Sequence, residues 1–153
     1  MPGDAEVVAG WHLFNEAHNR IAAAIRRDLA HHHGLDPAAF DVLLQLSRAP
    51  EQRRTASELA AEVSFSSGGF TKLADRLERA GFVARRQSRQ DRRRVWITLA
   101  PAGAEVLAAA ATRLGGLLRR ELWEPLGPEG FATFTDSLGT LAARARSGPT
   151  ALR

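Results

Sequence analysis

The stretch that decides the fold lies mid-chain, where residues 55–99 read TASELAAEVSFSSGGFTKLADRLERAGFVARRQSRQDRRRVWITL. Its opening TASE, at 55–58, matches the capping box, in which the threonine and glutamate side chains each accept a hydrogen bond from the other residue's backbone N–H. A short helix is expected to follow and to break at 64–69. Ser66 then suits the N-cap of a second helix, and Gly81 suits its end. Two short helices joined by a tight turn are the helix-turn-helix pattern.

The second half of the same stretch predicts a basic β-hairpin. Residues 82–89 and 93–99 have strand character, and Val95, Ile97 and Leu99 alternate with the residues between them. The connection between the two strands is polar and positively charged. A hairpin placed directly after a helix-turn-helix makes a winged helix, so the predicted fold is mainly α with a small β-wing.

Helical patterns flank this segment on both sides. Apolar residues recur at intervals of three and four over 8–33, which predicts one long helix. A helix over 36–48 begins with aspartate and proline, which suit the N-cap and the first helical position. A helical stripe over 101–123 is followed by a break at 125–128 and a final helix.

The long flanking helices predict an assembly of two chains. We expect a winged helix-turn-helix domain at 36–100, dimerisation helices at 7–34 and 101–146, and flexible ends at 1–6 and 147–153. A chain of 153 residues offers these apolar stripes little to pack against, so a second copy is expected to bury them. The alternative is a monomer in which the helices fold back on the middle domain.

Charge is concentrated in the predicted helix-turn-helix and wing. Residues 64–99 hold 9 basic and 3 acidic side chains, a net charge of +6, whereas the other 117 residues hold 12 basic and 14 acidic, a net charge of −2. A basic segment on a nearly neutral scaffold is expected of a nucleic-acid surface. A solvated arginine-rich face is the alternative, because 20 of the 21 basic residues are arginine.

Several classes of function are excluded or disfavoured. The chain has no cysteine, which excludes disulfides, a thiolate nucleophile and cysteine-bearing metal sites. No secretory signal and no transmembrane segment are visible, so a cytoplasmic protein is expected. No phosphate loop or catalytic motif appears, and we expect neither enzyme activity nor a cofactor. The three histidines at 31–33 point about 100° apart on a helix, so no metal site is expected.

The residues of the middle segment resemble the MarR family of bacterial winged-helix regulators. Three pieces carry the resemblance: SELA at 57–60, SSGGFTKLADRLERAG at 66–81, and DRR at 91–93 with the strand VWITL at 95–99. They are similar to the opening of the helix pair, the recognition helix and the Asp-x-Arg wing tip of that family. The resemblance implies a homodimer that binds a pseudo-palindromic operator, most often as a repressor. The alternative is a winged-helix module that binds a protein partner without specific DNA binding.

The recognition helix is expected to enter the major groove by its N-terminal half, and the wing to reach the minor groove. The resemblance implies that Arg93, held by the Asp91 carboxylate, is the minor-groove residue. Arg76 could instead pair with Asp75 or Glu78. The residues expected to contact DNA are Ser66, Ser67, Gly68, Thr71, Lys72, Arg76, Arg89, Asp91, Arg92 and Arg93.

Trp11, Phe14 and His18 lie on the apolar stripe of the first helix. The resemblance implies an effector pocket for aromatic or anionic molecules between the dimer helices and the winged domain, and these three residues are its candidates. The alternative for His18 is a core or interface histidine that makes one hydrogen bond. That alternative is favoured, because lone buried histidines are usually satisfied structurally.

Overall fold

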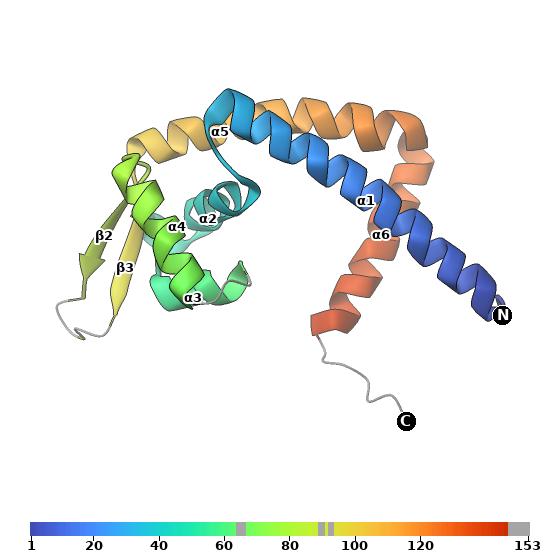
Figure 1. Cartoon of the computed structure of the whole chain (residues 1–153), viewed down its shortest axis with the longest axis horizontal. Coiled ribbons are helices and arrows are strands. Elements are labelled where there is room, and N and C mark those ends of the chain that lie inside the picture. Colours follow the sequence, from blue (N-terminus) through green and yellow to red (C-terminus); the bar gives the residue numbers. More distant parts are fainter. Residues whose placement is uncertain (64–66, 89–90, 92–93, 147–153) are drawn as a thin grey trace. The chain divides into compact units, whose positions relative to one another are not determined.

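The computed structural model describes residues 1–63, 67–88, 91 and 94–146, and Figure 1 shows its helices and strands. The predicted fold class is confirmed: the chain is mostly helical with a small antiparallel sheet. Two compact units are distinguished, 1–114 and 115–153. The elements are α1 (Asp4–His33), α2 (Pro37–Arg48), η1 (Pro50–Gln52), β1 (Arg53–Thr55), α3 (Ala56–Glu62), α4 (Ser67–Arg79), β2 (Val83–Gln87), β3 (Val95–Leu99), α5 (Pro101–Leu118), η2 (Arg119–Trp123) and α6 (Glu124–Arg146).

Local sequence signals fix several helix ends. The Asp36 side chain caps α2 by accepting from the backbone N–H of Ala39 at 2.8 Å. The capping box before α3 is complete, since Thr55 N donates to Glu58 Oε2 at 2.9 Å and Glu58 N donates to Thr55 Oγ1 at 3.3 Å. Gly81, with φ of 73°, turns the chain out of α4. The expected N-cap of α4, Ser66, lies outside the described residues.

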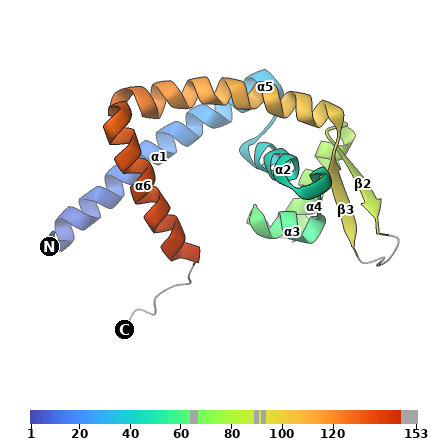
Figure 2. The same cartoon turned by 180° about the vertical axis from the view of Figure 1, so that it is seen from behind.

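The wing is a three-stranded sheet, which the sequence did not predict. Strand order is β1-β3-β2, both pairings are antiparallel, and both Arg54 of β1 and Arg85 of β2 pair with Ile97 of β3. Strands β2 and β3 lie side by side, as Figure 2 shows from behind. The two-stranded prediction missed β1 because this strand has only three residues, two of them arginine, and is formed by its pairing with β3.

One core joins the winged-helix elements with the adjoining parts of α1 and α5. The same core places α4 and the sheet against α2, which sets where the predicted DNA-contacting helix and the wing lie. Its fully buried members include Leu29, Leu43, Leu46, Leu59, Ile97 and Ala110.

The first helix begins at Asp4, four residues before its predicted start, and its N-terminal half is exposed. In the second unit, α6 bends at Gly127, where φ is 66° and Pro128 follows. The predicted break at 125–128 is therefore confirmed. Among the described residues, no helix combines the length and the apolar character that a membrane span requires.

Candidate nucleic-acid interface

Helix α4 separates a buried apolar face from an exposed polar one. Phe70, Leu73 and Leu77 are buried in the core. Because a helix repeats every 3.6 residues, most positions between them point outward, whereas Ala74 is buried with them. Four of the residues predicted to contact DNA are exposed on that outward face, which therefore carries two positive charges and a hydroxyl: Gly68, Thr71, Lys72 and Arg76.

Arg76 has a different partner from the two that were considered. Its guanidinium forms an ion pair with Asp36, the N-cap of α2, rather than with Asp75 or Glu78. The Arg76 side chain is still 52% exposed. Asp36 therefore caps one helix with one carboxylate oxygen and holds a basic side chain of α4 with the other.

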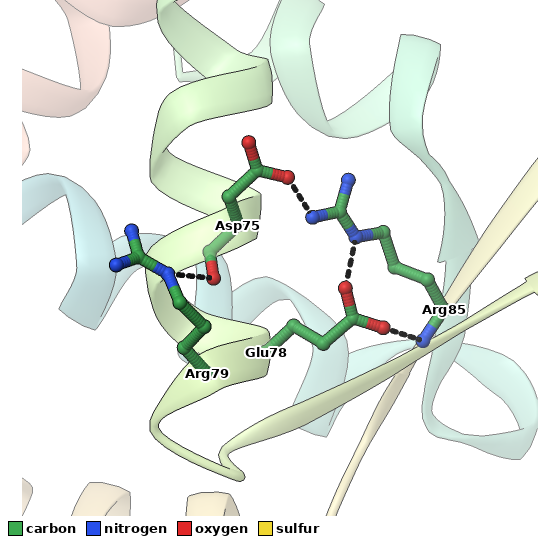
Figure 3. Close-up of polar contacts among 4 residues, drawn as sticks. All are labelled: Asp75, Glu78, Arg79 and Arg85. Atoms are coloured by element: carbon green, nitrogen blue, oxygen red, sulfur yellow. Dashed lines mark hydrogen bonds and ion pairs between the residues drawn. The ribbon is translucent and has the colours of Figure 1, made fainter.

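Asp75 and Glu78 bind an arginine of the wing instead. Arg85 of β2 donates from Nε to Glu78 Oε2 at 2.8 Å, and its Nη2 binds the Asp75 carboxylate (Figure 3). The bond to Asp75 raises the pKa of the Arg85 guanidinium above its ordinary value. The single charge of Arg85 thus offsets one of the two negative charges that Asp75 and Glu78 bring to α4. The basic side chains exposed on α4 itself are Lys72, Arg76 and Arg79.

The described part of the wing connection is held by short backbone contacts. Ser88 N donates to Arg94 O and Arg94 N donates to Asp91 O, both at 2.9 Å. The Asp91 carboxylate lies 3.7 Å from Arg94 Nε. The predicted pairing of Asp91 with Arg93 lies outside the described residues, as do Arg89 and Arg92.

Sequence reasoning missed three basic residues around the wing. Arg53, Arg86 and Arg94 line a hollow of about 590 Å³ on the sheet, together with Trp96. The Arg53 guanidinium lies 4.8 Å from the centre of the Trp96 ring. Arg86 and Arg94 belong to the arginine-rich run and were open to prediction, whereas Arg53 reaches the sheet only through the unpredicted strand β1.

The candidate effector residues form a row on α1. The ring centroids of Trp11 and Phe14 are 5.8 Å apart, and those of Phe14 and His18 are 6.1 Å apart. Trp11 is 61% exposed and Phe14 is 42% exposed in the single chain. The structure therefore brings the three residues together on a surface.

A second polar group links α1 to α5. Arg113 Nε donates to Asp28 Oδ1 at 2.9 Å, and Arg113 also contacts the His32 ring. Partial loss of solvent, with the nearby charge of Arg113, lowers the pKa of His32 below its ordinary value. No group of three or more metal-binding side chains occurs among the residues that the structure describes.

Comparison with known proteins agrees with this arrangement. The MarR family model matches residues 33–94, which span the helix-turn-helix and reach into the wing. The chain is 25% identical to Sco3205, a MarR family transcriptional regulator from Streptomyces coelicolor whose crystal structure is in complex with DNA. That likeness has a TM-score of 0.85 and covers 98% of this chain and 92% of Sco3205. Over residues 33–94, the chain is therefore similar to the MarR family.

The curated relatives of the chain are described as HTH-type transcriptional regulators. The chain is 30% identical over 94 residues to the HTH-type transcriptional regulator PapX of Escherichia coli, and 32% identical over 98 residues to the uncharacterized HTH-type transcriptional regulator YkoM of Bacillus subtilis. These alignments cover 61% and 63% of this chain and only 57% and 61% of the relatives. The relatives are transcriptional regulators, so the prediction that the chain is not an enzyme is confirmed.

Proposed function

We propose that the chain is a MarR-family protein that binds double-stranded DNA as a homodimer and regulates transcription, with repression by promoter occlusion as its mode. The observation that carries the proposal is the exposed face of α4, where Gly68, Thr71, Lys72 and Arg76 stand beside the arginine-rich wing. Lysine and arginine on a helix that fits the major groove supply both phosphate neutralisation and contacts to guanine edges. The DNA-bound relative in Streptomyces coelicolor supports the same use of the fold.

The homodimer is supported by apolar side chains that remain exposed in a single chain. Val8 is 54% exposed, Trp11 61% and Leu13 69%, all on the N-terminal half of α1. Large exposed apolar side chains grouped on one element mark an interaction site. Two copies related by a two-fold axis would read a pseudo-palindrome with half-sites about one helical turn apart.

Release by a small effector completes the proposal. Trp11, Phe14 and His18 would line the effector site once a second chain covers α1, and an aromatic or anionic molecule would shift the two DNA-binding lobes. The protein would act in the cytoplasm, where its DNA target lies. A module that binds only a protein partner is the competing function, and the positive wing argues against it.

Selection of DNA fragments from the source genome, followed by titration of the enriched sequence, tests the proposal. We expect Lys72→Ala to weaken operator binding about tenfold, and log affinity to fall with log salt by about 0.9 per phosphate neutralised. By the resemblance, Arg93→Ala should weaken binding more without unfolding the protein. Arg144→Ala, which removes the same charge from exposed α6, is the matched control and should leave affinity unchanged.

Two outcomes contradict the proposed function. If selection enriches no fragment and the affinity for all duplexes is equal, the competing protein-binding module is supported. If Lys72→Ala and Arg144→Ala weaken binding equally, the α4 face is not the contact surface and the binding reflects overall charge only.

A further inference from the structure

We propose that Arg85 is a positioning residue, which fixes the recognition helix α4 and the wing in the relative orientation that lets both contact one duplex. The inference rests on the proposed DNA binding and assigns to Arg85 a role that acts through Asp75 and Glu78. It is carried by three hydrogen bonds that one residue of β2, Arg85, donates to α4, two from its side chain and one from its backbone (Figure 3).

The Glu78 carboxylate holds both the backbone and the side chain of Arg85. The Arg85 backbone N donates to Glu78 Oε1 at 3.3 Å, and Arg85 Nε donates to Glu78 Oε2 at 2.8 Å. The other edge of the guanidinium binds Asp75, which precedes Glu78 by three residues. Because residues three apart are neighbours on a helix surface, the planar guanidinium spans one turn of α4. This fixes direction as well as distance, which a single ion pair would not.

The position of Arg85 in the strand separates it from the arginines that are available to DNA. Alternate residues of a strand point to opposite faces, so Arg85 points toward α4 and Arg86 points away. The Arg85 side chain is 22% exposed, whereas Arg86 is exposed. With Nε and Nη2 already bonded to carboxylates, Arg85 keeps only part of its donor set for a phosphate.

The chain between the two elements needs this support. Helix α4 ends at Arg79 and β2 begins at Val83, with Gly81 between them in the left-handed region. The buried residues Val83 and Leu99 hold the base of the wing in the core, and Arg85 adds a polar contact to α4 two residues further along β2. Motion of the wing beyond its base that is lost on binding costs conformational entropy. Contacts that fix the orientation of the wing before DNA binds reduce this entropy cost. Arg85 also offsets part of the negative charge of two carboxylates that would otherwise repel phosphates near the helix.

A double-mutant cycle measured by DNA affinity tests the role. Glu78→Gln removes a negative charge from a DNA-facing helix, so simple electrostatics predicts tighter binding. A positioning role predicts the opposite, and we expect binding about threefold to tenfold weaker. Arg85→Met should weaken binding about tenfold or more in the wild-type background, and about threefold or less when Glu78 is already Gln, because coupled residues are not additive. Arg85→Lys should not restore wild-type affinity, since an ammonium cannot span both carboxylates.

Arg86→Met is the matched control, because it removes the same charge from the next residue on the opposite face of the strand. We expect its effect to be the same with and without Glu78→Gln. If Arg85→Met costs equal factors in both backgrounds, or Arg85→Lys binds like the wild type, Arg85 acts as a charge on DNA and the inference is overturned.

Two further measurements keep the result decisive. A urea titration of each variant shows whether it is folded. If Arg85→Met does not fold, the effect of Glu78→Gln on DNA affinity tests the inference instead. Tighter DNA binding by Glu78→Gln overturns the inference, and weaker binding supports it. If the wild type itself binds no duplex above background, the proposed function fails. If the wild type binds an operator and the cycle is additive, only the inference fails.

Discussion

The winged-helix core and the N-terminal half of α1 differ sharply in where their apolar side chains lie. In α2, Leu43 and Leu46 have no exposed surface, whereas in α1 Val8 is 54% exposed and Trp11 is 61% exposed. Both helices carry apolar residues at helical spacing. Helical spacing of apolar residues therefore identifies the side of a helix that becomes covered. It does not show whether the covering residues belong to the same chain.

The largest effect is expected where the core is fully closed. Leu43→Ala should lower the free energy of unfolding by about 3 to 5 kcal/mol, because it removes buried methyl groups and leaves a cavity. Leu13→Ala is the matched control and should change the unfolding of the isolated chain by less than about 0.5 kcal/mol. Urea titration at low protein concentration measures both. Equal costs at the two sites would remove the distinction between the core and α1.

The sequence was informative where a structural signal lies within a few residues. The capping box at Thr55, the N-cap at Asp36 and the left-handed turn at Gly81 all join neighbours in the chain, and the structure has each of them. The exposed face of α4 was also predictable from nearby residues, because Lys72 and Arg76 are one turn apart on a helix with a strongly periodic pattern.

Features that depend on distant residues could not be predicted. Arg76 finds Asp36, 40 residues earlier, and Arg113 finds Asp28, 85 residues earlier. Strand β1 exists because β3 pairs with it, and it brings Arg53 to the wing. These contacts are decided by packing of the whole domain, for which the local propensity of the residues gives no signal.

Gly103 offers a second test of how tightly the core is closed. A Cβ at this buried position of α5 would lie 2.9 Å from the carbonyl carbon of Phe82, and closer to its oxygen. Gly103→Ala should therefore destabilise the protein by about 2 to 3 kcal/mol, although alanine favours helix. Gly115→Ala in the same helix meets nothing within 4 Å and should not destabilise it. Thermal or urea unfolding measures the stability of both variants. If Gly103→Ala and Gly115→Ala are both as stable as the wild type, α5 can move away from the Phe82 carbonyl.

The exposed row on α1 should matter for association instead. Trp11→Ala is expected to weaken the proposed homodimer by about 2 kcal/mol, or roughly thirtyfold in its dissociation constant, because truncating a large aromatic anchor commonly costs this much. Trp96→Ala, which removes an indole from the wing, should leave the dissociation constant unchanged. Sedimentation velocity over a range of concentrations measures both variants. Identical self-association of all three proteins would place the dimer contact elsewhere.

The smallest effect concerns how the stability of the winged-helix domain depends on pH. Two carboxylates of this domain, Glu58 and Asp41, predict opposite trends. The hydrogen bonds from Thr55 lower the pKa of Glu58, so its contribution is present above the pKa of the unfolded glutamate, about 4.3, and is lost as pH falls through the lower folded value. Loss of water raises the pKa of Asp41, so the protonated form is favoured and that contribution fades as pH rises through the folded value. The stability of Glu58→Gln should therefore approach that of the wild type as the solution is acidified. The stability of Asp41→Asn should approach or exceed that of the wild type as pH rises from about 3 to about 6, the range in which carboxylates titrate. Unfolding midpoints at several pH values measure both trends. Parallel trends in the two variants would mean that overall charge, rather than the capping box, sets the acid response of the winged-helix core.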